Sequence, residues 1–532
     1  MSDNDENILK SNDQIDPWHS KPLDVHRWSD HPEVNKLVDR VWNMLSEDVR
    51  SSLIGKSNNA GTPPKRILKV LLIDLYVTWL DDPELCIGVS RSDGTWKPSS
   101  RYNAINIPKK VNDLIDLLVE GDLLLFVGGS NDRKFGGRYG HTSRIKASGC
   151  LIKLFKECSV SEFEFNKHSD TETIILNEFD TDTEGNIIKT GGRRKKKKVI
   201  QLEYQDTDLT RGMRETLRAY NHLLHNTYVD ISSLDKNYVV RQDSKGKTIR
   251  VPVNQRSKFV RRIFSRGEWH YNGRFYGGFW QQVGEEYRKD IRIDDVPTIE
   301  VDFKGLHPAI IAATKGVNSV GDRYSLEEGL IARLNPDQQR DAVKLLALTA
   351  INANSRTQAF QAHVDASEIK LKHDELNVLL DAFIEHNPYL DDHICSDKGI
   401  ELMYLDSQIT ESIIQAFINE DKPILTVHDS YVVQVHDTEY LHQQMRIATK
   451  KVLGTELQFD QDYLSYKQAK QRMDGIEEDA ILPTTNTTVE LLELIPTPHR
   501  SRRYINTIIK FVDWQSEYNP TKIYNIRHIQ DL

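Results

Sequence analysis

The stretch TIEVDFKGLHP, residues 298–308, is the part of the sequence from which we interpret the fold. It predicts a short strand over Thr298–Phe303 that carries Asp302 to its C-terminal end. Gly305 predicts a tight turn, and a helix is expected over Leu306–Lys315. A carboxylate at a strand end, facing the start of a helix, is a common arrangement for holding a divalent cation. One aspartate is not a site, so this interpretation depends on a second carboxylate and on a helix that binds phosphate.

The second carboxylate is Asp429, at the tip of a predicted hairpin. ILTV, residues 424–427, predicts one strand, His428–Ser430 predicts the turn, and YVVQV, residues 431–435, predicts the returning strand. Aspartate is common in turns, so Asp429 by itself is unremarkable. Two aspartates on adjacent strands, however, can hold two divalent ions about 3.5–4 Å apart, which is the clamp for in-line attack on phosphorus. One ion lowers the pKa of the attacking 3′-hydroxyl, and the other neutralises the departing pyrophosphate.

A helix with a strong start signal is predicted between the two carboxylates. Asn335 suits the cap position, Pro336 the first helical position and Gln338 a reciprocal capping contact. Four residues then recur every fourth position and share one face: Arg340, Lys344, Leu348 and Asn352. The two cations would bind a triphosphate, and the leucine and asparagine would meet the sugar and base. The alternative is a solvated cation pair, although an anion between the cations would relieve their repulsion.

Composition sets limits on the class of protein. The chain has 532 residues, enough for two to four domains, and is 38% hydrophobic and 28% charged, as expected of a globular protein. Its net charge of -9 excludes a simple polycation, so a nucleic-acid partner would need local basic surface. The four cysteines form no CxxC pair, and neither a signal peptide nor a membrane-spanning run is found. We therefore expect a cytoplasmic protein without disulfides or membrane contact.

The front half, residues 1–205, suggests an α/β domain. A helix to about Leu118, a strand over Leu123–Val127 and a basic glycine-rich loop over residues 128–146 follow the order of a winged helix, placed at about 66–160. Its DNA-contacting cations would be Arg133, Lys134, Arg138, Arg144 and Lys146. The alternative is a small packing domain with a solvated loop. A second basic run lies within residues 190–198 and is either a solvated loop or a contact with the nucleic-acid backbone.

The segment HYNGRFYGGFWQQV, residues 270–283, is dense in aromatic residues, glycine and arginine. Arg274 lies between Gly273 and an aromatic pair, where the backbone can approach a ligand closely. Aromatic rings beside an arginine suit stacking on nucleotides, and an aromatic core edge is the alternative.

Taken together, these segments resemble the palm and fingers of family A DNA polymerases and their relatives, the single-subunit phage and mitochondrial RNA polymerases. Asp302 matches the first metal-binding aspartate of the family, and Arg340 with Lys344 matches its triphosphate-binding fingers helix. Asp429 matches the second metal ligand, with His428 near the primer end. The resemblance covers about Trp269–Tyr466.

Two further matches concern the template–primer duplex. Gly273-Arg274 resembles a family segment whose arginine touches the minor groove, and Gln408 resembles a glutamine that follows the duplex. The resemblance implies two Mg²⁺ ions, with Mn²⁺ as a substitute, bound by both aspartates and the carbonyl of Phe303. Its implied partners are a DNA primer–template, dNTPs or NTPs, and accessory replication proteins.

Four residues depart from the family pattern and bear on the choice of sugar. His307 occupies the position where DNA polymerases often carry a glutamate that excludes the ribose 2′-hydroxyl. Leu348 and Asn352 replace an aromatic residue and a tyrosine, and Ser430 follows Asp429 as in some RNA polymerases. We expect His307 to lie near the sugar.

The expected architecture is a right-hand polymerase of the α+β class, with a mostly antiparallel palm sheet and helical fingers and thumb. A thumb-like helical connector is expected over residues 206–268, the palm and fingers over 269–473, and a tail over 474–532 whose basic amphipathic helix, Arg500–Trp514, docks on the core or contacts a partner. The predicted activity is that of a DNA polymerase from a mobile element. The alternatives are an RNA polymerase or primase that starts chains without a primer, and a DNA-binding initiator or regulator with an inactive palm.

Overall fold

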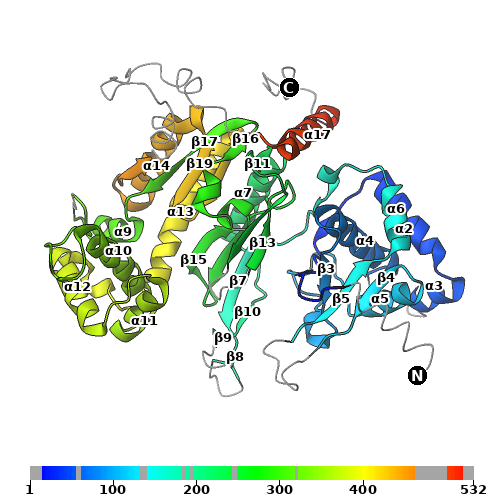
Figure 1. Ribbon diagram of the computed structural model, residues 1–532, viewed down its shortest axis with the longest axis horizontal. Coiled ribbons are helices and arrows are strands. Elements are labelled where there is room, and N and C mark those ends of the chain that lie inside the picture. The colour runs from blue at the N-terminus through cyan, green and yellow to red at the C-terminus, as the bar shows by residue number, and fades with distance from the viewer. Residues whose placement is uncertain are drawn as a thin grey trace.

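The computed structural model describes residues 15–54, 62–130, 140–182, 187–190, 196–242, 248–317, 321–461 and 500–518. It is a mixed helix and sheet structure with two large hydrophobic cores and a smaller one. Figure 1 shows the N-terminal part in blue and cyan on one side, separate from the green, yellow and orange remainder. The core of the N-terminal domain ends at Phe165, and the second core begins at Ile174 and includes Leu176, Leu202 and Tyr204.

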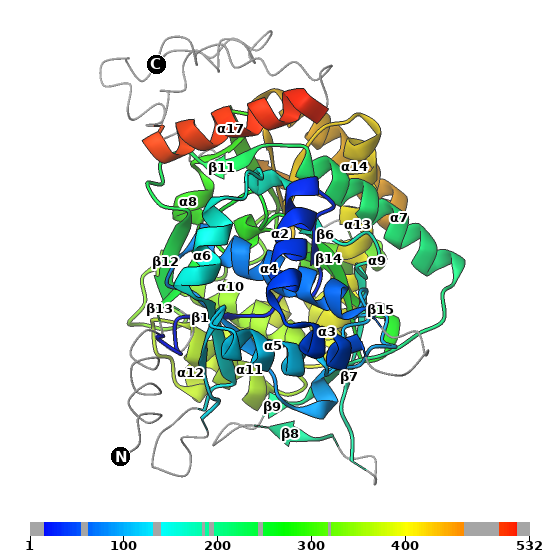
Figure 2. The same ribbon diagram turned by 90° about the vertical axis from the view of Figure 1, so that its right-hand side faces the viewer.

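The N-terminal domain is built around one apolar helix, α4 (Pro64–Asp81), in which every residue from Ile67 to Thr78 is buried. A helix that is apolar on all sides must be covered all round, and a sheet and four other helices pack around α4 (Figure 2). The helices are α2 (Pro32–Met44), α3 (Glu47–Ile54), α5 (Val111–Glu120) and α6 (Gly149–Lys156). The sheet has the order β1-β3-β5-β4, made by Ser20–Pro22, Cys86–Val89, Ser143–Ala147 and Leu124–Val127.

The rest of the chain contains two larger sheets. The first has the order β10-β7-β14-β15, made by Val199–Gln201, Ile174–Phe179, Arg261–Ser265 and Glu268–Tyr276. The second, which we call the central sheet, has the order β11-β16-β17-β19-β18, made by Val229–Ile231, Ile291–Ile293, Val296–Phe303, Ser430–Gln434 and Ile424–Val427. Strand β20 (Phe459–Gln461) also pairs with β17. Every pair in the central sheet is antiparallel, as expected for this part of the chain.

Helices pack around these sheets, and some of the helices between β17 and β18 form a separate group at one end of the molecule (Figure 1). Beside the sheets lie α7 (Asp208–His225), α8 (Glu285–Arg288), α9 (Leu306–Thr314), α13 (Gly399–Asn419) and α14 (Thr438–Leu453). The separate group consists of α10 (Pro336–Asn352), α11 (Arg356–Ala366) and α12 (His373–His386). In the described part of residues 206–268 the one α-helix is α7, and the other regular elements are strands joined by turns and loops, in contrast to the helical connector that we expected.

Short elements complete the described chain. The two-stranded sheets pair β2 with β6, β8 with β9 and β12 with β13, made by Arg27–Trp28, Asn166–Lys167, Lys189–Thr190, Lys196–Lys197, Tyr238–Gln242 and Thr248–Pro252. The 3₁₀ helices are Asp93–Thr95, Glu162–Glu164, Phe279–Gln281, Pro388–His393 and Val435–Asp437.

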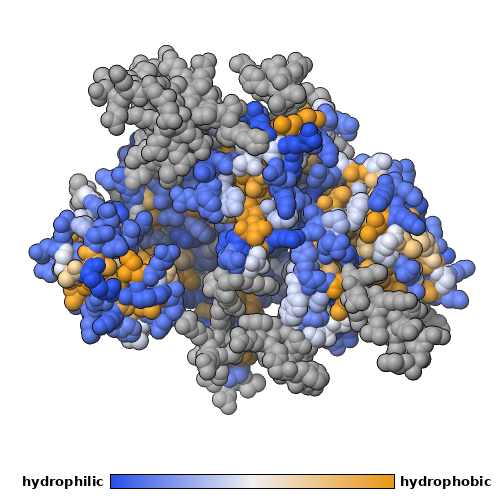
Figure 3. All heavy atoms as spheres, in the orientation of Figure 1, coloured by the Kyte–Doolittle hydropathy of each residue, from blue (hydrophilic) through white to orange (hydrophobic). Residues whose placement is uncertain are grey.

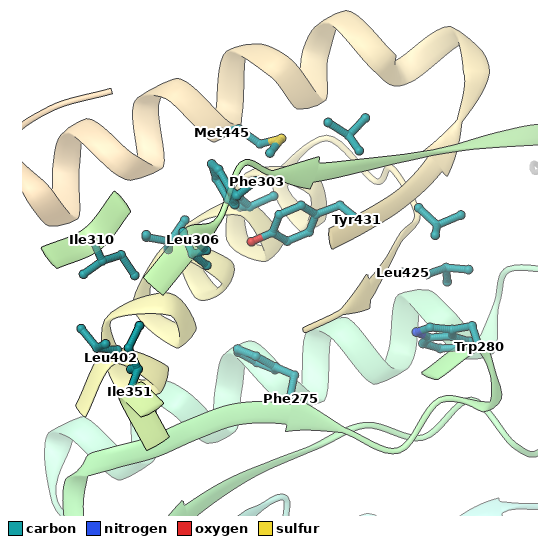
Figure 4. Close-up of a cluster of buried hydrophobic side chains, with 14 of the residues drawn as sticks. Phe275, Trp280, Phe303, Leu306, Ile310, Ile351, Leu402, Leu425, Tyr431 and Met445 are labelled. Carbon is teal, nitrogen blue, oxygen red and sulfur yellow. The ribbon is translucent and has the colours of Figure 1, made fainter. Parts of the chain in front are cut away.

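In the second core, which begins at Ile174, the central sheet packs against the helices that surround it. Phe303 of β17 contacts Tyr431 of β19 edge to face, with ring centroids 6.2 Å apart. Met445 of α14 lies on one side of this pair, and Leu306 of α9 lies close by (Figure 4). Trp280 is fully buried, and its indole N–H donates to the carbonyl of Thr426, 3.0 Å away. These contacts fix the strand ends at which Asp302 and Asp429 lie.

The helix predicted near the C-terminus is α17 (Arg502–Tyr518), and it docks on the protein. Tyr504, Ile508, Phe511 and Trp514 form a small core with Phe163 and Tyr228. Two ion pairs flank it, from Arg500 to Asp295 and from Arg503 to the fully buried Asp230. Because Phe163 and Tyr228 come from either side of the division between the large cores, α17 connects both parts.

The described surface is largely hydrophilic. The face shown in Figure 3 is mainly blue, with several smaller orange patches. In the described ranges, no helix has the length and apolar character needed to span a bilayer. Within the same ranges the four cysteines are free thiols, as expected.

Candidate functional site

Asp302 lies at the end of β17, where the strand meets the Gly305 turn and α9. Gly305 adopts φ 56°, a left-handed conformation that favours glycine, and a Cβ there would lie 2.8 Å from the hydroxyl of Tyr324. The strand, turn and helix therefore agree with the prediction from residues 298–308. The side chain of Asp302 is exposed, whereas its neighbours Val301 and Phe303 are buried. This alternation directs the carboxylate away from the core.

Asp429 is brought beside Asp302 by the pairing of β17 with β19. Asp302 pairs with Ser430, and the amide of Phe303 donates to the carbonyl of Asp429, 3.4 Å away. The two-residue turn between β18 and β19 places His428 at φ 58° and leaves Asp429 half-buried. The register of the sheet thus unites two acidic residues that are far apart in the sequence.

Asp429 is close enough to affect the ionisation of Asp302. Although the side chain of Asp302 is open to water on one side, the surrounding protein reduces its hydration. The negative charges of Asp429 and Glu300 add to this effect and raise the pKa of Asp302 to about 7. The positive charge of Lys344 acts in the opposite direction. A site that disfavours its own negative charge in this way favours a bound cation.

Glu300 has partners of its own within the protein, so its carboxylate is not available to bind a cation at this site. Arg288 donates two hydrogen bonds to its carboxylate, at 2.9 and 3.1 Å, and the hydroxyl of Ser430 donates a third. Among the described residues there is no group of three or more His, Cys, Asp or Glu side chains able to hold a metal ion. The donors that remain are two carboxylates and the nearby carbonyl of Phe303. This set suits Mg²⁺, which is usually bound by one or two carboxylates together with water and substrate phosphates.

Helix α10 presents the predicted cationic face. Asn335 caps it, Gln338 completes the capping box and Pro336 occupies the first turn. Arg340, Lys344 and Leu348 are exposed, and Asn352 is half-buried, whereas the opposite face of the helix is buried. Lys344 acts electrostatically on Asp302, so this face lies near the carboxylate pair. Asn352 donates to the carbonyl of Leu348 and packs against Gly399 of α13. Arg340, Lys344 and Leu348 therefore remain as the exposed part of this face.

Arg340 has an acidic partner that the sequence did not reveal. Its Nε–H donates to Oδ2 of Asp322, whose Oδ1 accepts from the amide of Tyr324 at 3.0 Å. Partial burial would raise the pKa of Asp322, but the hydrogen bonds from the amide of Tyr324 and from Arg340 lower it. Lys344 adds to the lowering. One carboxylate therefore faces both cations of α10.

Arg274 lies behind the carboxylate pair, on β15. Its Nε–H donates to Oδ2 of Asp406 on α13, and its Nη2 lies 3.2 Å from Nε2 of His307. The negative charge of Asp429 also acts on Arg274. Burial raises the pKa of Asp406 to about 7; Arg274 opposes this shift and Asp429 adds to it. Asp406 was not predicted as a site residue, and no local pattern in α13 distinguishes it from the other polar residues of that helix.

His307 is placed differently from our expectation of a side chain near the sugar. It is 6% exposed and contacts Arg274. Burial and the charge of Arg274 lower the pKa of His307 to about 3, so the ring is neutral at pH 7. Nε2 then accepts the hydrogen bond from Arg274. His307 therefore supports Arg274 in this conformation rather than facing the open side of the site.

A close backbone contact keeps β15 against α13. Gly273 adopts φ 76°, and a Cβ there would lie 2.8 Å from Oγ of Ser407 and 2.9 Å from the ring of Phe264. The carbonyl of Gly273 accepts from the buried Arg262, which also donates to Ser407 and pairs with Glu411 at 2.7 Å. These contacts hold α13 against β15 at Gly273, the residue that precedes Arg274.

The structure separates the two remaining predicted duplex contacts. His428 is exposed beside Asp429, with its ring centroid 5.9 Å from that of Tyr276. Gln408 instead lines a cleft of about 280 Å³ between α7, α13 and α14, together with Glu411 and Lys451. It lies two residues beyond Asp406 on the helix and faces a different side. His428 lies with the carboxylate pair, and Gln408 does not.

The winged helix predicted at about residues 66–160 falls in the N-terminal domain. The elements there follow the order helix, strand, helix, strand, loop, strand, and β5 lies between β3 and β4 in the sheet. The exposed side chains of α5 include Asp113, Asp116 and Glu120, which repel phosphate. Arg144 is buried and donates to the carbonyls of Pro17 and Thr142, and Lys146 pairs with Glu84. Both predicted DNA contacts are thus occupied within the fold. Arg133, Lys134 and Arg138 lie outside the described residues, as does most of the basic run at 190–198.

A large cleft among the described residues, about 1220 Å³, lies between the N-terminal domain and β10. Trp96, Tyr102, Lys97 and Lys198 contribute to its lining, and it shares no residue with the carboxylate pair. Lys198 is paired with Asp180 and Lys21 with Asp74 at the same cleft. Its size alone therefore does not identify a binding site.

Comparisons with known proteins add little to this description. No protein-family model matches the chain, and no curated protein matches it. A comparison of structures finds the POL domain of Pol1 from M. smegmatis, described in complex with DNA primer-template and dNTP, at 13% sequence identity and a TM-score of 0.23. The match covers 48% of this chain and 51% of that one, so the chain spans about half the length of the matched structure.

Proposed function

We propose that this chain is a template-directed nucleotidyltransferase, and specifically a DNA polymerase that extends a primer. The observation that carries the proposal is the meeting of Asp302 and Asp429 at the ends of adjacent strands, with the pKa of Asp302 raised to about 7. A structural aspartate is usually satisfied by hydrogen bonds to its charged form, which lower its pKa. Here the surroundings of Asp302, including the charge of Asp429, disfavour its ionised form, as expected of a residue that shares a cation.

The cation would be Mg²⁺, or Mn²⁺ as a substitute, held by Asp302, Asp429 and the carbonyl of Phe303. When bound there, the metal would lower the pKa of the attacking hydroxyl and stabilise charge on the leaving pyrophosphate. The open positions on the metal would be filled by water and phosphate oxygens.

The positively charged side chains of Lys344 and Arg340 would bind the incoming nucleotide. Lys344 and Arg340 share one exposed face of α10, one turn apart, and Lys344 lies near enough to act on Asp302. They would bind the triphosphate by charge-assisted hydrogen bonds and bring its α-phosphate to the carboxylate pair. The exposed Leu348 follows one turn later and would contact the nucleotide. Arg274 and His428, on the other side of Asp429, would position the primer–template.

The test is extension of a labelled primer on a DNA template. Asp302→Asn and Asp429→Asn are expected to lower extension by at least about 10³-fold, because each removes a ligand from the metal clamp. Binding of the primed duplex should persist in both variants. The matched control is Asp421→Asn, at the opposite end of β18, where the aspartate lies in a turn at φ 51° and asparagine is equally accommodated. Full extension by either site variant would refute the metal assignment, and no incorporation by the wild-type protein would favour the initiator or regulator.

An RNA polymerase or primase is a second candidate, supported by one observation. Helix α9 has no acidic residue in its first turn, and the buried His307 occupies the position where the related DNA polymerases carry a glutamate. A carboxylate that would exclude the 2′-hydroxyl is therefore missing from this described turn. Extension assays with dNTPs and NTPs, each with and without a primer, separate the two candidates. De novo synthesis from NTPs would replace the first proposal with the second.

A further inference from the structure

Arg274 is held between two acidic residues with different surroundings. Asp406, on one side, has no exposed surface and accepts the Nε–H of Arg274. Asp429, on the other side, is half-buried at the cation site and acts on Arg274 electrostatically. The side chain of Arg274 is 14% exposed, so its charge is poorly screened by water and needs a counter-charge. The two acids therefore compete for one guanidinium group.

The outcome of this competition matters for the cation site. A guanidinium paired with Asp429 would occupy the oxygens that a divalent cation needs. In the structure, Nε and Nη2 are used by Asp406 and His307 instead. Nη1 makes no hydrogen bond to another described residue, which leaves it for a ligand at the site.

Helix α13 also carries a second buried ion pair that does not share this geometry. Arg262 pairs with Glu411 and donates to Ser407 and to the carbonyl of Gly273. It anchors the same strands to the same helix, one turn from Asp406. The pair of Arg262 and Glu411 is therefore a matched control for a purely structural role.

We propose that Asp406 is a positioning residue, which holds the guanidinium of Arg274 away from Asp429 and presents it to the primer–template. This inference deepens the proposed function and depends on it for the identity of the DNA ligand. Asp406 touches neither the metal nor the substrate and acts through Arg274.

The first experiment measures metal affinity without DNA or turnover. Free Mn²⁺ is followed by electron paramagnetic resonance while each variant is titrated. Asp406→Asn should weaken Mn²⁺ binding roughly five- to tenfold, within the range of couplings between neighbouring charged groups. The released guanidinium then competes for Asp429. The double variant Arg274→Met with Asp406→Leu should restore the wild-type affinity, because the competing charge is gone. Glu411→Gln should leave Mn²⁺ binding unchanged.

The second experiment measures binding of a primed duplex by fluorescence anisotropy in EDTA. Arg274→Met and Asp406→Leu should each weaken binding, and the double variant should bind as the single Arg274→Met variant does. Such non-additivity is expected when one residue acts only through the other. Circular dichroism and thermal unfolding report whether each variant folds. The double variant exchanges a whole buried pair for apolar residues and is the version expected to fold even where Asp406→Asn does not.

The inference is overturned if Asp406→Asn binds Mn²⁺ and primed duplex as Glu411→Gln does. It is also overturned if the effects of the two substitutions on duplex binding are additive. A wild-type protein that binds Mn²⁺ but no primed duplex would refute the proposed function and the DNA part of this inference. In that case, unchanged Mn²⁺ affinity in Asp406→Asn would separately refute the role of Asp406 at the cation site.

Discussion

Arg340, a cation expected to bind triphosphate, donates its Nε–H to the carboxylate of Asp322. Both side chains are partly exposed, at 44% and 36%, so water screens the pair and its contribution to stability is small. A triphosphate can therefore displace Asp322 at little cost. The same carboxylate also lies near Lys344, which makes it an internal counter-ion for the whole cationic face.

Asp322→Asn is accordingly expected to strengthen nucleotide binding. It removes a competing negative charge from Arg340 and Lys344, and we expect the Kd for a triphosphate to fall roughly three- to tenfold at low salt, as for loss of one exposed charge contact. Fluorescence titration with a labelled nucleotide measures this effect. Asp381→Asn is the control, since Asp381 forms a similar exposed ion pair with Arg356 on α11 and α12. Equal or weaker binding by Asp322→Asn would contradict the role of Asp322 as a counter-ion.

Asp302→Asn is expected to stabilise the metal-free protein. In EDTA at pH 8, above the raised pKa of about 7, both carboxylates are ionised and repel each other. The substitution removes this repulsion, and because the side chain is exposed we expect a gain of only about 1 kcal/mol in the free energy of unfolding. Added Mg²⁺ should raise the melting temperature of the wild-type protein and leave the variant nearly unchanged. Differential scanning calorimetry provides both comparisons, and a variant that responds to Mg²⁺ like the wild type would count against the site.

The buried His307 predicts a loss of stability in acid. Its pKa is about 3 in the folded protein, compared with about 6.5 in an unfolded chain. The unfolded state therefore binds the proton more readily, so the stabilisation is complete above pH 6.5 and is lost as the pH falls toward 3. The slope is about 1.4 kcal/mol per pH unit for one such group.

His307→Gln should make urea unfolding less sensitive to pH between 6 and 4, by about this amount per pH unit. The exposed His270 is the control, and His270→Gln should keep the wild-type slope. If both variants show the wild-type slope, His307 is not held neutral by its surroundings.

The ion pair between Arg503 and Asp230 is expected to hold α17 in place. Asp230 is fully buried and accepts two hydrogen bonds from the guanidinium, at 2.8 and 2.9 Å. Arg503→Met leaves this carboxylate without its counter-charge, which costs about 3–5 kcal/mol in comparable buried pairs. Urea unfolding of Arg503→Met and of the adjacent, exposed Arg502→Met gives the comparison. A similar small effect in both variants would show that the aromatic contacts alone secure the helix.

Local sequence signals predicted the parts of the site that are set by neighbouring residues. The Gly305 turn, the Asn335 cap and the two-residue turn at His428 all fall where expected, since each depends on residues within about four positions. The face of α10 that carries Arg340 and Lys344 follows in the same way from helical periodicity.

Contacts between distant segments were not predicted. Arg274 meets Asp406, 132 residues away, and His307, 33 residues away, and no local pattern encodes either contact. His307 illustrates the consequence, because the family resemblance predicted a place near the sugar and tertiary packing buries the side chain. A thumb-like helical connector was expected over residues 206–268, yet within it β14 forms a strand by pairing with β7 and β15. The pairing partners of a strand determine such a segment more than its own composition does.

The absence of a side chain at Gly273 sets the spacing between a strand and a helix. With Ser407 and Phe264 within 3 Å of any added Cβ, an alanine there would force β15 and α13 apart by several tenths of an ångström or more. Arg274 and Asp406 are the immediate neighbours of the residues in contact, so that shift would lengthen the hydrogen bond between them first. A single methyl group, placed on a residue with no charge of its own, would thereby change which acid the arginine pairs with.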